Sequence, residues 1–242
     1  MADTALKFPD PAPALPAEAM RFQGEDFLPL VSGALYWKAA ETLIVADLHL
    51  SKLASYAPRG QMLPPYDTAL TLRKLEADLA ATGARELIAL GDNFHRDDGM
   101  LHLTETDRHR LARLRDTVAI SWITGNHDEN PLGLGETTTA IHRGGITFTH
   151  HPSRKTPTMA GHLHPAAHIA INGRSTRRRC FVADGTLMIL PAYGSSTGAL
   201  NILGPAFNGL LDHGRLEVRM IGRDRVYPVS PKRLVTGSDG GF

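Results

Sequence analysis

The chain has 242 residues, of which 42% are hydrophobic, so it is long enough to bury one sizeable core. Its formal net charge of +1 at pH 7 is nearly balanced, which excludes a global electrostatic attraction to nucleic acid or membrane. Any affinity for a polyanion must therefore be local. The single cysteine, Cys180, excludes an internal disulfide, and we expect it to be buried and unreactive.

The two ends of the chain differ in composition from the part between them. We expect a proline-rich, flexible lead-in over residues 1–24, a single folded domain over 25–230 and a loose, glycine-containing tail over 231–242. The beginning of the chain carries no charged-then-apolar signal pattern, and no run approaches the roughly 20 apolar residues of a membrane helix. We therefore expect a cytoplasmic protein with no membrane partner.

The first half of the chain alternates between strand and helix patterns. The uniformly apolar Leu43-Ile44-Val45 predicts a strand buried on both faces. Leucines at helical spacing, followed by Gly83 as a stop, predict an amphipathic helix over 67–81. The other expected elements are a hairpin of 30–37 and 42–47, a long loop over 51–65, strands over 86–90 and 118–124, and a helix over 104–115. This order predicts an α/β fold, with helices packed on a parallel or mixed sheet.

From about Ile146 onward, the alternation of strand and helix patterns gives way to short strand-like runs. Short apolar runs separated by turns occupy residues 146–149, 168–171, 180–183, 186–190 and 216–221, and only 195–202 has some helical character. We expect these runs to form a second, largely antiparallel sheet that packs against the first.

Side chains that bind metals follow several of the expected strands. They are Asp47, His49, Asp92, Asn126, His150, His162 and His164. Open α/β sheets place their ligand sites at the carboxyl ends of strands. Residues two apart in a strand share a face, so Asp47 with His49, and His162 with His164, are expected to point to one metal site. Carboxylate, imidazole and amide donors together suit Mn, Fe or Zn and are too rich in imidazole for Mg or Ca alone.

Such a donor set suits a pair of metal ions. Two divalent ions about 3.5 to 4 Å apart activate water and clamp a phosphate during in-line displacement. Asp92 is the candidate bridge, because a carboxylate has two oxygens, and Asn126 is a neutral ligand. Its neighbour His127 then remains free to meet the substrate. The sequence therefore predicts hydrolysis of a phosphoester.

Five sequence blocks, taken in order, resemble the calcineurin-like metallophosphoesterase superfamily. They are Asp47-Leu48-His49, Gly91-Asp92, Gly125-Asn126-His127-Asp128, His150 and Gly161-His162-Leu163-His164. The resemblance implies a four-layer αββα sandwich of two mixed sheets flanked by helices, with two divalent ions, Mn first and Fe or Zn as alternatives. It implies one metal on Asp47, His49, Asp92 and His164, and the other on Asp92, Asn126, His150 and His162. It also implies that His127 stabilises the transition state or protonates the leaving oxygen.

One block points to a branch of that superfamily. Many phosphatase members carry an Asp three residues after the bridging Asp, whereas this chain carries His95 in Gly91-Asp92-Asn93-Phe94-His95. That block resembles the nuclease branch, in which the His lies beside the phosphate, and His95 is therefore a second candidate catalytic residue. The chain is most similar to the group of bacterial ligase-associated DNA damage response endonucleases. This similarity implies DNA as the substrate, a role in repair, and a ligase and other repair proteins as partners.

Several assignments remain open at this stage. We favour His150 over His151 as the ligand, because His150 directly ends its strand. Arg174, Arg177, Arg178 and Arg179 either contact backbone phosphates or form a solvated hairpin tip. Arg154 and Lys155 are candidates for lining the same cleft. For His102, His109, His142, His168 and His213 we expect structural or solvent-exposed roles.

Two other functions compete with a DNA nuclease. The first is a phosphatase, or a small-molecule or cyclic-nucleotide phosphodiesterase, on the same site; it would need a closed pocket, whereas a polymer needs an open, basic groove. The second is a non-catalytic scaffold, against which the retention of Asp92, Asn126 and His127 argues.

Overall fold

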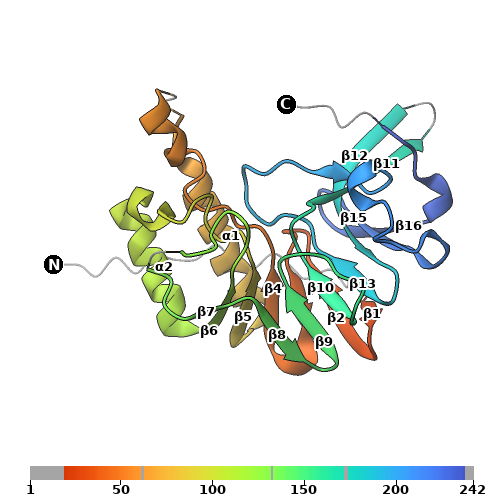
Figure 1. Cartoon of the computed structure of the whole chain (residues 1–242), viewed down its shortest axis with the longest axis horizontal. Coiled ribbons are helices and arrows are strands. Elements are labelled where there is room, and N and C mark those ends of the chain that lie inside the picture. Colours follow the sequence, from red (N-terminus) through yellow and green to blue (C-terminus); the bar gives the residue numbers. More distant parts are fainter. Residues whose placement is uncertain (1–18, 61–62, 132, 172–173, 238–242) are drawn as a thin grey trace.

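Two β-sheets packed face to face form the centre of the computed structural model, which describes residues 19–60, 63–131, 133–171 and 174–237 (Figure 1). Within these residues, the first sheet has seven strands in chain order: β1 (Met20–Phe22), β2 (Glu25–Pro29), β3 (Leu35–Trp37), β4 (Thr42–Val45), β5 (Glu86–Leu90), β6 (Ala119–Ile123) and β7 (Thr137–Thr138). The strands from β1 to β4 pair antiparallel and those from β4 to β7 pair parallel. The sheet is therefore mixed, as the alternating pattern predicted.

The second sheet is also mixed. Its strands in the described chain are β8 (Ala140–Arg143), β9 (Ile146–Thr149), β10 (Thr158–Ala160), β11 (Pro165–Ile171), β12 (Arg174–Ala183), β13 (Leu187–Ile189), β14 (Leu200–Asn201), β15 (Glu217–Ile221) and β16 (Val226–Val229). They are ordered β14-β11-β12-β13-β10-β9-β8, and β15 pairs with β12 and β16. Most pairs are antiparallel, but β10 runs parallel to both β9 and β13, and β14 runs parallel to β11.

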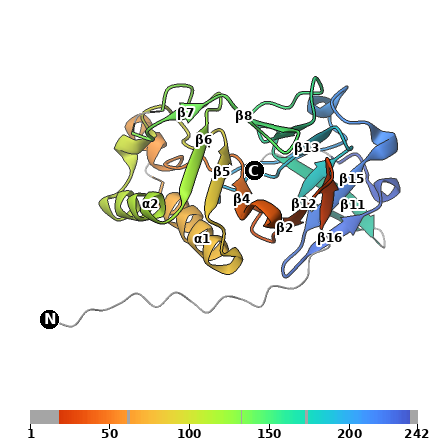
Figure 2. The same cartoon turned by 90° about the horizontal axis from the view of Figure 1, so that it is seen from below.

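Two α-helices in the described residues cover the outer face of the first sheet: α1 (Tyr66–Thr82) and α2 (Glu105–Thr117) (Figure 2). Leu72 and Leu75 of α1 pack on Leu43 of β4 in one buried cluster. As predicted, α1 ends at Gly83, which is in the left-handed conformation, and Thr104 caps α2 by accepting the Asp107 N–H at 3.1 Å. None of the described helices is long and apolar enough to cross a membrane.

The hydrophobic core has three layers, and β4 explains why its sequence is uniformly apolar. Leu43 and Val45 face the helices, whereas Ile44 faces the second sheet and shares a cluster with Phe148 and Met188. All three β4 residues are fully buried, which confirms the expectation for this strand. On the outer face of the second sheet, a third cluster covers Cys180 and its neighbours. Burial raises the pKa of the Cys180 thiol, in keeping with an unreactive residue.

The fold class, an α/β sandwich, is confirmed, and its fourth layer is built from turns. Phe207 and Leu211 cover the outer face of the second sheet, and the short 3-10 helices η4 (Pro205–Phe207) and η5 (His213–Arg215) lie in this segment. The helical character expected over 195–202 is wrong. Its backbone bonds to other segments instead: the Leu200 N–H donates to the His164 carbonyl at 2.9 Å, and 200–201 form β14.

Four further 3-10 helices lie in the connections of the described chain. They are η1 (Lys38–Ala40), η2 (Ala54–Arg59), η3 (Gly99–His102) and η6 (Pro231–Arg233). η1 closes the β3–β4 hairpin at the predicted place. η2 lies within the expected loop over 51–65.

The folded part of the chain extends further at both ends than the composition predicted. The lead-in expected over 1–24 is wrong at its boundary, because β1 pairs with β2 and Met20 is buried between the sheets. The rest of that segment, 1–18, lies outside the described residues.

The loose tail expected over 231–242 is likewise wrong for 231–237. Leu234 forms a β-bridge with Ile169, and the Val235 N–H donates to the His168 carbonyl at 2.9 Å. These contacts hold the segment on the second sheet, whereas 238–242 lie outside the described residues.

Phe148→Ala tests the inter-sheet core. The Phe148 side chain is fully buried, and its ring centroid lies 6.1 Å from that of Trp37, so truncation leaves a cavity between the sheets. We expect the free energy of unfolding to fall by about 3 to 5 kcal/mol, measured by urea denaturation. The matched control is Leu101→Ala, whose side chain is 65% exposed and should change stability by less than about 0.5 kcal/mol. Equal effects of the two substitutions would contradict this packing.

Candidate metal centre

Backbone pairing continues past the ends of β4 and β5. The Asp47 N–H donates to the Gly91 carbonyl at 3.2 Å, and the His49 N–H donates to the Asp92 carbonyl at 2.8 Å. Leu50 and Phe94 then form a parallel β-bridge. The loops that carry the first three candidate ligands are therefore held side by side by the same type of bond that builds the sheet.

Five of the seven candidate ligands have left-handed backbone conformations. Their φ angles are 54° at Asp47, 44° at His49, 47° at Asp92, 74° at His162 and 45° at His164. Such conformations cost non-glycine residues about 1 to 3 kcal/mol each and gather at functional sites. The explanation by strand alternation is wrong for both pairs, because all four residues lie in loops beyond the strands. Left-handed turns present their side chains to a common space instead.

One group of donors is formed by Asp47, His49 and His164. The Nε2 atoms of His49 and His164 are 3.4 Å apart, and His164 Nε2 lies 3.5 Å from Asp47 Oδ1. The buried carboxylate is further held by the His162 N–H, which donates to both of its oxygens at 3.0 and 3.1 Å. One ligand atom from each member of the group lies within 4.8 Å of the others, close enough to bind one ion.

A second group of donors surrounds His150. Its Nδ1–H donates to the Leu90 carbonyl at 2.9 Å, which turns Nε2 toward the other donors. This Nε2 lies 2.9 Å from Asn126 Oδ1 and 3.1 Å from His162 Nδ1. The backbone carbonyl thus orients the imidazole as a metal ligand requires.

Asp92 lies between the two groups. Its Oδ2 is 3.7 Å from His49 Nε2, and its Oδ1 is 3.4 Å from His150 Nε2. The His127 N–H donates to Oδ1 at 2.9 Å and fixes the carboxylate in this orientation. The side chain is buried, and each of its oxygens faces a different cluster.

The electrostatics of the site favour bound cations. Burial lowers the pKa of His49 to about 2 and also lowers the pKa of His162, so both rings are held neutral with their lone pairs available. Burial would raise the pKa of the Asp47 carboxyl, but its hydrogen bond and charge interaction with His164 lower it, and the same interaction raises the pKa of His164. Carboxylates and neutral imidazoles turned toward one another in a buried space fit divalent metal ions.

The glycines of the sequence blocks allow the loops to approach one another. A Cβ at Gly125 would lie 2.1 Å from Asp92 Oδ1, and one at Gly161 would lie 2.7 Å from Asp47 Oδ2. Any side chain at either position would displace a candidate ligand of a different block. The glycines are therefore part of the site.

Asp128 is a structural residue of the site to which the sequence interpretation assigned no role. It is fully buried, and its carboxylate accepts the backbone N–H groups of Gly125 at 2.9 Å, Asn93 at 2.8 Å and Phe94 at 3.2 Å. It thereby joins the Gly125 loop to the loop after Asp92. Asp side chains in turns commonly accept N–H groups that follow them in the chain, whereas Asp128 accepts from groups that precede it, so local turn chemistry did not reveal this role.

His127 and His95 lie on the open side of the donor groups. The His127 side chain is 41% exposed, and its Nδ1–H donates to the His95 carbonyl at 3.3 Å. The two rings stack with their centroids 5.0 Å apart, and one nitrogen of each lies close to a nitrogen of His49. The fold brings both candidate catalytic residues to the same edge of the site.

The remaining candidates from the sequence are His151 and the basic residues, and not all of them lie at the metal centre. His150, His151 and His162 can approach a common ion, so the preference for His150 over the exposed His151 stays a prediction. Arg154 forms an ion pair with Asp184. Arg177 and Arg179 line a separate cavity, and the side chain of Arg174 lies outside the described residues.

A solved bacterial protein shares this fold. No family model and no curated protein matches the chain. The crystal structure of the nuclease MPE from Pseudomonas putida is similar, with a TM-score of 0.66 and 27% sequence identity. The match covers 87% of this chain and 98% of the nuclease chain. The α/β sandwich with buried His and Asp groups that can bind metal is therefore similar to that of a bacterial nuclease.

Asp128→Ala tests the link between the two loops. Removing the carboxylate leaves three backbone N–H groups without their acceptor, and each buried, unsatisfied group costs about 1 to 3 kcal/mol. We expect a loss of at least about 3 kcal/mol in the free energy of unfolding and lower metal content by elemental analysis. Glu129→Ala, at the exposed neighbouring position, is the control and should change neither quantity. An Asp128→Ala protein with wild-type stability would show that the link is dispensable.

Proposed function

We propose that the protein is a two-metal-dependent phosphodiesterase that cleaves DNA, with Asp92 as the ligand shared by the two ions. The position of Asp92 carries the proposal, because its two oxygens face two separate donor groups. Asp47, His49, Asp92 and His164 would hold one ion, and Asp92, Asn126, His150 and His162 the other. Mn is the first expectation, with Fe or Zn as alternatives.

Two observations support a nucleic-acid substrate. The solved neighbour is a nuclease that matches most of this chain. The edge of the site is also open, since Asn126, His127 and His151 are exposed. An open edge admits a polymer, whereas a small phosphoester is usually enclosed.

We assign proton transfer and contact with the phosphate to residues of the chain itself. Bound divalent ions supply Lewis-acid activation of water and neutralise phosphate charge. His127, whose Nδ1–H is held by the His95 carbonyl, presents Nε2 on the substrate side, 3.9 Å from Asp92 Oδ2. In this position a protonated Nε2 donates its proton to the leaving oxygen. His95 stacks on this ring, keeps its orientation and contacts the phosphate.

The biological setting follows from the resemblance of the His95 block. On that basis we place the protein with the bacterial ligase-associated DNA damage response endonucleases of the calcineurin-like superfamily. It would act in cytoplasmic DNA repair beside a ligase. Co-purification of a ligase from the source cell would test this part independently of the chemistry.

Metal depletion and reconstitution test the central proposal. The chelated protein should cleave neither single-stranded nor nicked DNA, and added Mn should restore cleavage, with about two ions bound per chain. Asp92→Ala should lose metal at both positions because it removes the shared ligand. Efficient hydrolysis of a small phosphoester with no cleavage of DNA would establish the phosphatase or small-molecule alternative.

His127→Ala separates catalysis from metal binding. We expect the turnover of DNA to fall by about 10² to 10⁴, the usual range for general acid catalysis, with metal content unchanged. His109→Ala on the exposed surface of α2 is the control and should have wild-type turnover. A parallel loss of metal in His127→Ala would identify this residue as a ligand.

A further inference from the structure

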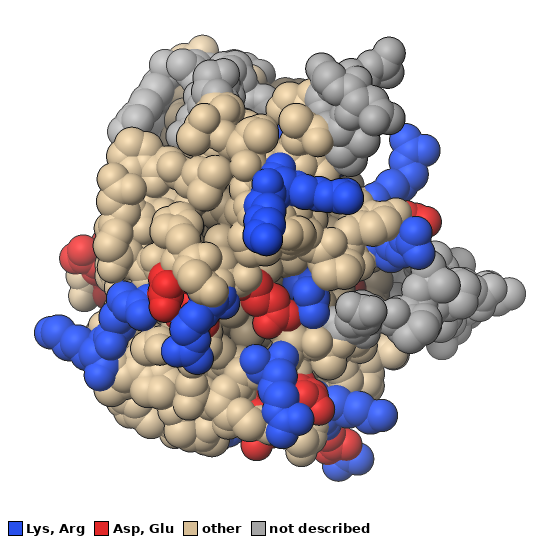
Figure 3. Space-filling view, turned by 90° about the vertical axis from the view of Figure 1, so that its right-hand side faces the viewer, with Lys and Arg blue, Asp and Glu red and all other residues tan. Residues whose placement is uncertain are grey.

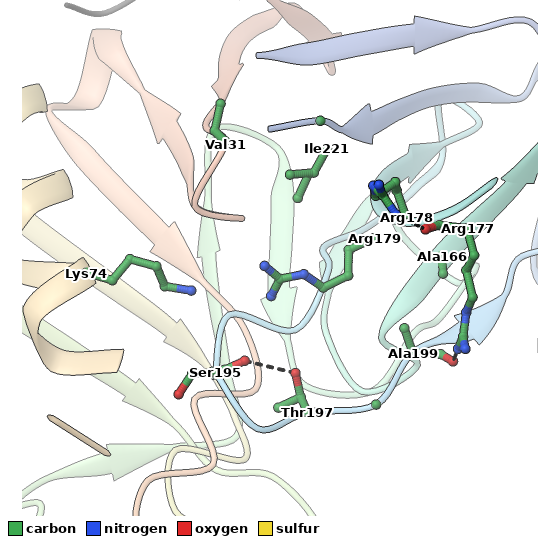
Figure 4. A pocket seen from close by; sticks show the side chains of 13 residues that line it. Val31, Lys74, Ala166, Arg177, Arg178, Arg179, Ser195, Thr197, Ala199 and Ile221 are labelled. Carbon is green, nitrogen blue, oxygen red and sulfur yellow. Dashed lines mark hydrogen bonds between the residues drawn. The ribbon is translucent and has the colours of Figure 1, made fainter. Parts of the chain in front are cut away.

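A cavity of about 560 Å³, lined by both polar and apolar residues, adjoins the loop that follows β13. The residues that define this basic cavity are Lys74 of α1, Arg177 and Arg179 of β12, and Ser195 and Thr197 of the loop after β13 (Figure 4). The cations thus come from helix and sheet segments about 100 positions apart in the sequence. The cavity is no part of the donor groups described above.

The register of β12 explains why arginines lie here. Phe181 and Ala183, on one face of the strand, pack in the core between the two sheets, whereas Cys180 and Val182 face the opposite cluster. Because alternate residues share a face, Arg179 and Arg177 continue the row of Phe181 and Ala183. The inward face of β12 therefore changes from apolar to basic as it leaves the core.

Lys74 and Arg179 point toward each other across the cavity (Figure 4). Their hydrogen bonds go to backbone carbonyls: Lys74 Nζ donates to Ser32 at 3.1 Å and to Tyr193, and Arg179 Nη1 donates to Ala192 at 2.7 Å. A backbone carbonyl accepts a hydrogen bond from a cationic side chain but does not neutralise the charge of that side chain. Among the described residues, neither cation forms an ion pair with a carboxylate. The cavity thus holds basic side chains whose hydrogen-bond acceptors are uncharged.

Burial and mutual repulsion make this arrangement costly for the chain alone. Burial, and then the charge of Arg179, lower the pKa of Lys74 to about 7. The acid nearest to Lys74, Asp78, is hydrogen-bonded to the Tyr193 hydroxyl at 2.7 Å, and burial raises the pKa of its carboxyl. The charge of Asp78 raises the pKa of Lys74 but does not cancel the effects of burial and of Arg179. An anion placed between Lys74 and Arg179 would further relieve their repulsion.

The loop that lines the basic cavity also holds the metal centre. The Gly194 N–H donates to the Asp47 carbonyl at 3.1 Å, and the Leu200 N–H donates to the His164 carbonyl at 2.9 Å. The cavity therefore adjoins the first donor group but is separated from it by one loop. On the side of the molecule that carries β12, β15 and β16, a group of Lys and Arg side chains stands without an acidic neighbour (Figure 3).

We propose that the basic cavity binds a backbone phosphate of the nucleic-acid substrate, away from the bond that is cleaved. This inference rests on the proposed function and deepens it. Arginine presents a planar fork of N–H donors that matches phosphate oxygens. A polymer extends beyond the cleaved bond, whereas a small ester does not. The cavity therefore contributes to binding only when the substrate is a polymer.

Binding of an end-labelled, single-stranded DNA oligonucleotide to metal-depleted protein tests the proposal without cleavage. Arg179→Gln and Arg177→Gln should each weaken binding by about tenfold in fluorescence anisotropy. Each should also reduce the slope of log affinity against log salt by about 0.7 for every phosphate that the variant no longer neutralises. Arg85→Gln is the control, because that side chain is 82% exposed and precedes β5 at the opposite end of the sheet; it should bind as the wild type does.

Hydrolysis of bis(p-nitrophenyl) phosphate by the Mn-loaded variants separates binding from folding. We expect wild-type rates with this small ester, since it does not reach the basic cavity. Unchanged oligonucleotide affinity in both variants would overturn the proposal, and so would a parallel loss of ester hydrolysis, which would indicate a structural role for the arginines. Weakened binding of a mononucleotide with unchanged binding of the oligonucleotide would assign the cavity to a free nucleotide instead.

The two proposals can fail separately. A wild-type protein that binds the oligonucleotide through Arg177 and Arg179 but never cleaves it with any metal would refute the nuclease function and leave the phosphate site standing. Cleavage of DNA that is insensitive to both substitutions would support the nuclease and refute the phosphate site.

Discussion

Nitrogen and oxygen atoms of types that bind metals face one another in the space around Asp92, and the surrounding structure holds them there. The Nε2 atoms of His49 and His164 lie 3.4 Å apart, and His150 Nε2 lies 3.4 Å from Asp92 Oδ1. Burial holds His49 neutral by lowering its pKa. Burial opposes the charged forms of Asp47 and His164, but their hydrogen bond and mutual attraction lower the pKa of the carboxyl and raise the pKa of the imidazole. Cations are the simplest means of stabilising such an arrangement.

Backbone hydrogen bonds maintain this geometry against conformational cost. Five candidate ligands have left-handed conformations, and such residues persist only where their surroundings over-determine them. Here the surroundings are backbone bonds from Asp47 and His49 to the loop after β5, and the carboxylate of Asp128, which joins that loop to Gly125. The strands that precede these loops fix the positions at which the loops begin. The site therefore depends on Asp128 as well as on the candidate ligands, although Asp128 is not one of them.

The loop after β13 connects the two polar regions of the molecule. Through Gly194 and Leu200 its backbone supports the carbonyl groups of Asp47 and His164, and through Ser195 and Thr197 it lines the basic cavity. The expected helix over 195–202 would have withdrawn the Leu200 N–H into a bond within the helix. The segment remains irregular because its hydrogen bonds are made to neighbouring strands, and propensity alone cannot reveal such partners.

The amino-acid sequence by itself determined the order of strands and helices in the first half, the buried β4, both helix boundaries at Gly83 and Thr104, and the donor types gathered at strand ends. These features are local, arising from periodicity, capping and composition within a few turns of chain. Tertiary structure alone decided the packing of Met20 and Leu234 at the two ends, the placement of Asp92 between two donor groups and the opposition of Lys74 to Arg179. Those features join residues tens to more than a hundred positions apart, and left-handed conformations at Asp47 and His164 become stable only once the neighbouring loops bond to them.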